Sequence, residues 1–95
     1  MLILTRYNNQ RIVVIAPDGT EAWIKATQDG VVVTQVVCGV IIDWYMSYEF
    51  DLSGQTIVVT HLETRGKSKP IHRIGIDAPK DYLILREELL NRRVK

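Results

Sequence analysis

The sequence predicts a small, mainly β domain that ends in one short helix. Val, Ile, Thr and Tyr dominate almost every periodic segment, and the breaks between segments fall at Gly, Asn, Asp and Pro. β-Branched and aromatic residues favour strands, whereas those four residues favour turns. With 95 residues, 46% of them hydrophobic, the chain fits one domain, 1–95, whose core is marginal in size if the chain stands alone.

The two end portions of the chain predict five strands and the helix. The strands are expected at 2–6, 11–15, 57–63, 71–76 and 82–86. A turn at 7–10 joins the first two, and Pro79 breaks the ladder before the last because proline has no amide donor. From Glu87 to about Arg93 the acidic residues come first and the arginines last, which suits the dipole of a helix.

The middle of the chain predicts further strands joined by tight turns. Turns are expected at 17–19 and 28–30, with a strand at 21–26 between them. Between Val32 and Met46 every second residue is small or apolar, which predicts two more strands whose even-numbered residues form one buried face. Gly39 predicts a bulge or bend there. Such an apolar strand needs cover, from 21–26, from the rest of the sheet or from a second protomer.

Charge divides the chain into a basic part and an acidic part. Residues 16–56 hold six acidic residues against Lys25 alone, a net charge of −5, whereas the remainder holds eleven Lys and Arg against five acidic residues, a net charge of +6. A basic module interrupted by an acidic one is expected of a phosphate-binding core that carries an extension which does not bind RNA.

Cysteine use and apolar runs predict a cytoplasmic protein with no membrane partner. Cys38 is the only cysteine, so no intramolecular disulfide forms, and its valine neighbours predict a buried thiol. No signal peptide is recognisable. The longest apolar stretch, 31–46, falls short of the roughly 20 residues that cross a bilayer.

No constellation of residues predicts catalysis, a metal or another cofactor. His61 and His72 lack a metal-ligand spacing, and we expect them to be solvated or to lie on a sheet face. The sequence has no Gly-rich phosphate loop and no serine in a nucleophile elbow. The protein is therefore expected not to be an enzyme.

The two ends of the chain carry motifs that resemble a known family. The sequence reads MLILTR over 1–6 and RIGIDAPKDYLILREE over 73–88. A strand beginning at Met1, an R-I-G-I-x-A-P-K turn and a strand ending in Arg-Glu-Glu resemble the carbon storage regulator (CsrA/RsmA) family of small bacterial mRNA-binding repressors. Residues 16–56 stand where ordinary members have only a few turn residues, so they are expected to form an inserted β extension.

The resemblance implies an intertwined homodimer, a β-barrel or sandwich with a short C-terminal helix. In such a dimer the first strand of one chain lies beside the last strand of the other, which makes two identical composite sites. Each site is expected to take a single-stranded GGA sequence held in a hairpin loop, where the base edges are exposed. The implied function is post-transcriptional regulation, in which binding to mRNA leaders blocks the ribosome. Regulatory small RNAs with GGA loops and a protein antagonist are the other implied partners.

The RNA-binding residues that the resemblance implies come from both ends of the chain. The guanidinium of Arg86 is expected to pair with phosphate or a guanine edge, the alternative being a surface arginine paired with a glutamate. Tyr7 stands where members usually have a second arginine, and Leu85 where a histidine is common. The full expected set is Leu4, Thr5, Arg6, Tyr7, Lys80, Ile84, Leu85 and Arg86.

Two further alternatives stay open on the sequence. Arg65, Lys67 and Lys69 lie in a turn that is longer than the family's, where they form either a solvated turn or added phosphate contacts. The rival function is a dimeric protein-interaction module whose acidic insertion, 16–56, binds a protein partner or drives assembly.

Overall fold

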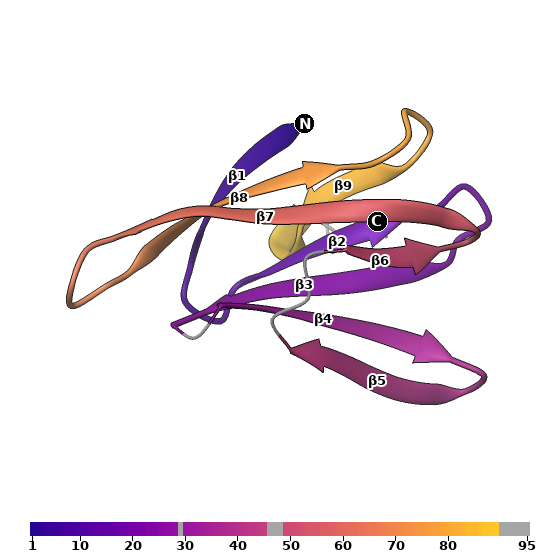
Figure 1. Ribbon diagram of the computed structural model, residues 1–95, viewed down its shortest axis with the longest axis horizontal. Coiled ribbons are helices and arrows are strands. Elements are labelled where there is room, and N and C mark those ends of the chain that lie inside the picture. Colours follow the sequence, from indigo (N-terminus) through magenta and orange to yellow (C-terminus); the bar gives the residue numbers. More distant parts are fainter. Residues whose placement is uncertain (29, 46–48, 90–95) are drawn as a thin grey trace.

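Two antiparallel sheets make up the computed structural model, which describes residues 1–28, 30–45 and 49–89 (Figure 1). Sheet A has the strand order β1-β8-β7-β6, and sheet B has the order β5-β4-β3-β2-β9. The strands are β1 (Leu2–Tyr7), β2 (Arg11–Ile15), β3 (Glu21–Thr27), β4 (Gly30–Val37), β5 (Val40–Tyr45), β6 (Glu49–Leu52), β7 (Gln55–Arg65), β8 (Ile71–Asp77) and β9 (Leu83–Arg86).

The prediction of a mainly β fold is confirmed, and the two sheets do not close into a barrel. Helical backbone follows β9 at 87–89, and the remainder of the expected helix lies outside the described residues. The short strand β6 was not expected from the sequence. Within the described residues, no helix has the length and apolar character needed to cross a membrane.

The middle segment, 16–56, is built into the fold rather than attached to it. β3 pairs with β2, so β3, β4 and β5 extend sheet B, while β6 pairs with β7 in sheet A. The core lies between the sheets, and both the middle segment and the chain ends supply it. The buried apolar residues of the segment include Ala22, Ile24, Ala26, Val31, Val33, Phe50 and Leu52, packed with Ile12, Val14, Ile57, Val59, Ile74 and Ile76.

The burial expected for the even-numbered residues from Val32 onward holds in β4 for Val32, which is 7% exposed, but not for the rest of that face. Val31 and Val33 are buried, whereas Val36 is 61% exposed, so the odd-numbered residues face the core. Cys38 is exposed, contrary to the prediction, because it occupies the turn between β4 and β5. Cys38 and Gly39 both have positive φ, 52° and 80°, as in the two-residue turns that favour hairpins. Gly39 therefore lies at a chain reversal. The single alternating pattern in the sequence spans two strands, and the residues that share one sheet face are odd-numbered in β4 and even-numbered in β5.

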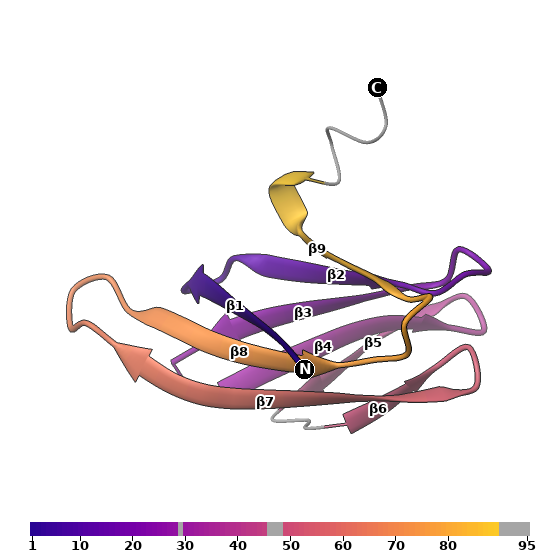
Figure 2. The same cartoon turned by 90° about the horizontal axis from the view of Figure 1, so that it is seen from above.

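Both terminal strands lie at sheet edges on the same side of the molecule. β1 is the edge of sheet A and pairs with β8, while β9 is the edge of sheet B and pairs with β2 of the same chain. Figure 1 shows both away from β5, which forms the opposite edge of sheet B, and Figure 2 shows β9 running alongside β2.

Candidate nucleic-acid interface

A cavity of about 350 Å³ lies where the two ends of the chain meet. We call it the rim cavity. β1 and the turn after it supply one wall, and the end of β9 with the residues that follow supplies another. Four of the eight predicted residues therefore come together within a single chain. The lining residues are Thr5, Arg6, Tyr7, Gln10, Ile71, Arg86 and Glu88.

Arg6 is buried in the wall of the rim cavity and is neutralised there. Its Nη1 and Nη2 donate to Oε1 and Oε2 of Glu88 at 2.7 and 2.8 Å, a bidentate ion pair, and the residue is only 4% exposed. The hydrogen bond from Arg6 lowers the pKa of Glu88 to about 2, and the charge of Arg86 acts in the same direction. Arg6 therefore links β1 to Glu88, in the helical backbone that follows β9.

Arg86 is the cation of the rim cavity that has no fixed partner. It lies half-buried opposite Ile12 of β2, and its guanidinium makes no hydrogen bond or ion pair with any residue that the structure describes. The two glutamates that follow it are engaged elsewhere, because Glu87 accepts from Arg11 at 2.6 Å and Glu88 pairs with Arg6. The alternative of an arginine paired with a glutamate thus describes Arg6 and Arg11 rather than Arg86.

Tyr7 separates the rim cavity from a second hollow of about 410 Å³. Its side chain is 49% exposed and lines both spaces. The second hollow brings in Lys69, from the connection between β7 and β8, together with Gln28 from the turn after β3. A half-exposed aromatic ring with a cation on each side is an arrangement that suits a single strand of nucleic acid. The second hollow is lined by Tyr7, Asn8, Gln28, Ser68, Lys69 and Pro70.

The other four predicted residues lie outside the rim cavity. Leu4 and Ile84 are partly buried and pack against the core beneath it, so they support the site without lining it. Leu85 lies opposite Val13 of β2. Because side chains alternate along a strand, it is on the other face of sheet B from Ile84 and Arg86. Lys80 is exposed in the connection that precedes β9, at the end of that strand remote from Arg86.

Sequence reasoning missed three residues of the rim cavity. Gln10 lies in the turn after β1, where its Oε1 accepts from the backbone amide of Tyr7 at 2.9 Å. Ile71 lies opposite Tyr7 on β8, and Glu88 neutralises Arg6. Only Glu88 had a signal in the sequence, since it belongs to the Arg-Glu-Glu motif.

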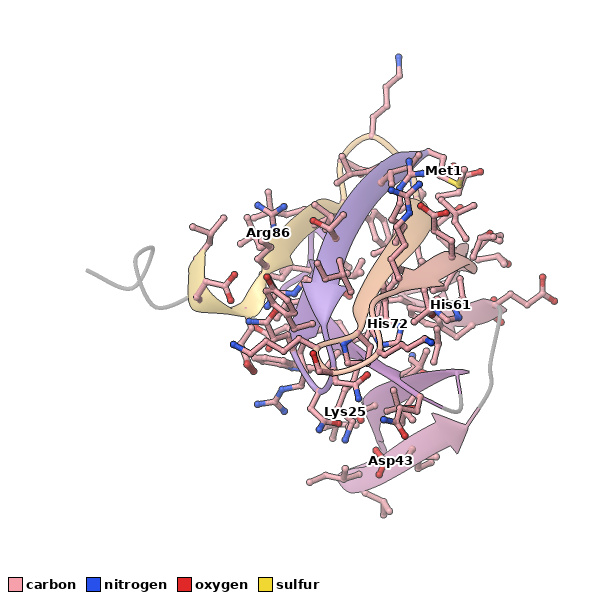
Figure 3. The ribbon with its side chains drawn as sticks, turned by 90° about the vertical axis from the view of Figure 1, so that its left-hand side faces the viewer. Met1, Lys25, Asp43, His61, His72 and Arg86 are labelled. Carbon is pink, nitrogen blue, oxygen red and sulfur yellow. The ribbon has the colours of Figure 1, made fainter. Side chains whose placement is uncertain are left out.

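The acidic middle segment leaves the rim cavity open. Of the acidic residues on this segment that the structure describes, none lines the cavity. Figure 3 shows Asp43 of β5 at the far side of the molecule from Arg86. These carboxylates therefore do not lie against a phosphate bound in the cavity, and any repulsion acts through solvent, where salt screens it.

Comparison of the chain with family models, with curated proteins and with solved structures found no match to any of them.

Proposed function

We propose that the protein is a post-transcriptional regulator that binds single-stranded RNA at the rim cavity. The observation that carries the proposal is the convergence of Thr5, from the first motif, and the adjacent Tyr7 with Arg86 from the second motif, whose guanidinium is unpaired. A free guanidinium beside an exposed aromatic ring supplies a phosphate or guanine contact and a stacking surface. The targets that fit the motifs are GGA-containing hairpin loops in mRNA leaders, and binding there blocks ribosome access.

The second hollow extends the path of the bound strand. A strand that lies across Tyr7 places one base on the tyrosine ring and its phosphates near Arg86 on one side and Lys69 on the other. Stacking of a base on an aromatic side chain contributes about 1–3 kcal/mol. On this path Lys69 makes the added phosphate contact, while Arg65 is held by Glu63 at 3.0 Å.

Substitution of Arg86 tests the proposal. Arg86→Ala should weaken binding to a GGA hairpin by about 1–3 kcal/mol, roughly 5- to 150-fold, because it removes the free cation of the cavity. Lys80→Ala is the matched control, since it removes one positive charge from an exposed residue outside the cavity. Fluorescence anisotropy with the GGA hairpin and with a scrambled loop, at several salt concentrations, gives the affinities.

Two outcomes would contradict the proposal in different ways. Equal losses for Arg86→Ala and Lys80→Ala would show that the rim cavity is not the binding site, because total charge alone would then set the affinity. Equal, weak binding of the GGA and scrambled loops by the unaltered protein would remove RNA recognition and favour the rival function.

That rival is a module that assembles through the middle segment, and one observation supports it. Val36, Val40 and Ile41 are 61, 59 and 71% exposed beside the turn that joins β4 and β5. β5 is also a sheet edge, whose free backbone groups are able to pair with another β5 in antiparallel fashion. The occupant would be a second copy of this chain. Ile41→Lys should then shift the mass measured by light scattering from dimer to monomer.

A further inference from the structure

Three side chains of β7 and β8 point their donor atoms at one another. Nε2 of His61 lies 3.0 Å from Nδ1 of His72, and Oγ1 of Thr64 lies 3.0 Å from each of these nitrogens. Figure 3 shows the two histidines next to each other. The three donor atoms thus form a nearly equilateral triangle, which we call the donor triangle.

A β-bulge creates the donor triangle. The register between β7 and β8 shifts between His61, opposite Ile74, and Glu63, opposite Arg73. The inserted residue moves Thr64 onto the same face as His61, although a regular strand would place residues three apart on opposite faces. Thr64 then lies directly opposite His72. The two histidines meet through the pairing of β7 with β8, so their spacing in the sequence gave no sign of a metal site.

His72 is held in the tautomer that a metal ligand requires. Its Nε2 lies within hydrogen-bonding distance of Oδ1 of Asn8, which is only an acceptor, so Nε2 carries the proton and Nδ1 keeps its lone pair. The ring is fully buried, which fixes its orientation. A carbonyl oxygen that orients the far nitrogen of a ligating imidazole is the usual support around protein-bound metals. Of the two alternatives expected for the histidines, His72 takes the sheet face and not the solvent, because it is buried on the inner face of sheet A.

The dimensions of the donor triangle fit a transition-metal ion. Metal–imidazole bonds are about 2.0–2.1 Å long, so two nitrogens 3.0 Å apart subtend about 94° at a shared ion. That angle lies between the roughly 90° of tetragonal and the roughly 109° of tetrahedral coordination. His61 is half-buried and Thr64 is exposed, so one side of the triangle faces solvent.

We propose that the donor triangle binds a late first-row divalent cation, with His61 Nε2 and His72 Nδ1 as the principal ligands and Thr64 Oγ1 as a third. Water completes the coordination from the exposed side. On binding, the proton of His61 resides on Nδ1, which leaves Nε2 free to ligate. Imidazole ligands suit Zn²⁺, Ni²⁺ and Cu²⁺, and the general order of affinity places Cu²⁺ first.

Charge and ligand number set the strength of this site. Arg6 lies beside His72 on the neighbouring strand, but its charge is balanced by Glu88. Among the described residues, no three His, Cys, Asp or Glu side chains gather as they do in a structural zinc centre. The site is therefore expected to bind more weakly than a centre with four protein ligands.

Calorimetric titration with Zn²⁺, Ni²⁺ and Cu²⁺ tests the proposal in a Cys38→Ser background, because the exposed thiol binds the same ions. One equivalent of each ion should bind, Cu²⁺ most tightly. His61→Gln should lower the affinity at least tenfold. Asn8→Ala should lower it about 10- to 100-fold, because it removes the group that orients His72. Circular dichroism of each variant verifies the fold, and His61 is substituted rather than the fully buried His72 for that reason.

The electron paramagnetic resonance spectrum of the Cu²⁺ complex provides a second readout, since nitrogen hyperfine splitting should be present in the parent and reduced in His61→Gln. Equal affinities for the parent and His61→Gln, or no binding at millimolar ion, would overturn the proposal. The donor triangle would then be a hydrogen-bonded network only. Neither result bears on RNA binding, because none of the three donor residues lines the rim cavity.

Discussion

At the scale of single residues, the ion pair between Arg6 and Glu88 joins the two ends of the chain. Arg6 is almost fully buried, and its Nε has no hydrogen-bond partner among the described residues, so loss of Glu88 would leave a buried cation without compensation. The pKa of Glu88, about 2, is depressed from its ordinary value of 4.5. A depressed carboxyl pKa stabilises the folded state above pH 4.5, and this stabilisation is lost as the pH falls through 2.

Glu88→Gln should therefore destabilise the protein at pH 7 and matter less in acid. Glu88 is 54% exposed, so solvent screening limits the loss to about 1 kcal/mol. Urea unfolding at pH 7, 4 and 2.5 should show that the difference in free energy of unfolding between the parent and Glu88→Gln becomes smaller as the pH falls. Glu87→Gln is the control, because its partner Arg11 is exposed and its effect should stay within about 0.5 kcal/mol. A difference in free energy of unfolding that is constant across this pH range would contradict the role assigned to Glu88.

The sequence identified four of the residues that line the rim cavity, but not how each side chain faces. Arg6 was expected to contact RNA, yet it shares the inner face of β1 with Leu4 and is neutralised. Its partner is 82 positions away, which no local pattern reveals. Arg86 was distinguished by the motif, and only the structure shows that its neighbouring glutamates are occupied.

At the scale of elements, the positions of most strands were predictable from the sequence, but the face that each strand buries was not. Nearly every segment rich in β-branched residues became a strand, because composition acts locally. The face that each strand buries depends on where the chain reverses, and one residue of error exchanges the two faces. Cys38 and Gly39 form such a reversal, and the sequence did not reveal it because valines stand on both sides of these two residues. The bulge at Leu62 is a second case, since it depends on pairing with β8 and not on any breaker residue.

The turn at Cys38 offers a stability test at this scale. Its φ of 52° disfavours cysteine, whereas asparagine tolerates this region, and Asn-Gly is the preferred pair for a two-residue hairpin turn. Cys38→Asn should raise the free energy of unfolding by about 0.5–1 kcal/mol, measured by urea denaturation. Cys38→Ser is the control, because serine gains no comparable preference for positive φ. An asparagine variant no more stable than the serine variant would show that the turn differs from the one described.

At the scale of the whole molecule, the middle segment completes the fold. It supplies three strands of sheet B and one of sheet A, and its apolar residues face those of the chain ends. The sequence indicated an insertion because of its charge and its position between the motifs. Its integration into one core was not predictable, because this depends on long-range pairing of β3 with β2 and of β6 with β7. The homodimer stays a prediction.

Both walls of the rim cavity come from the same chain, and this has a consequence for RNA binding. The expected composite site needs residues from two chains, whereas here Thr5, Tyr7 and Arg86 meet within one, because β1 and β9 both pair inside the same chain. Each chain should therefore bind one GGA hairpin, in a monomer or in a dimer. We expect calorimetry to give one hairpin per chain, and the affinity to stay constant on dilution to concentrations at which light scattering reports monomer. If hairpin binding is lost when dilution dissociates the dimer, the RNA site must lie between two chains.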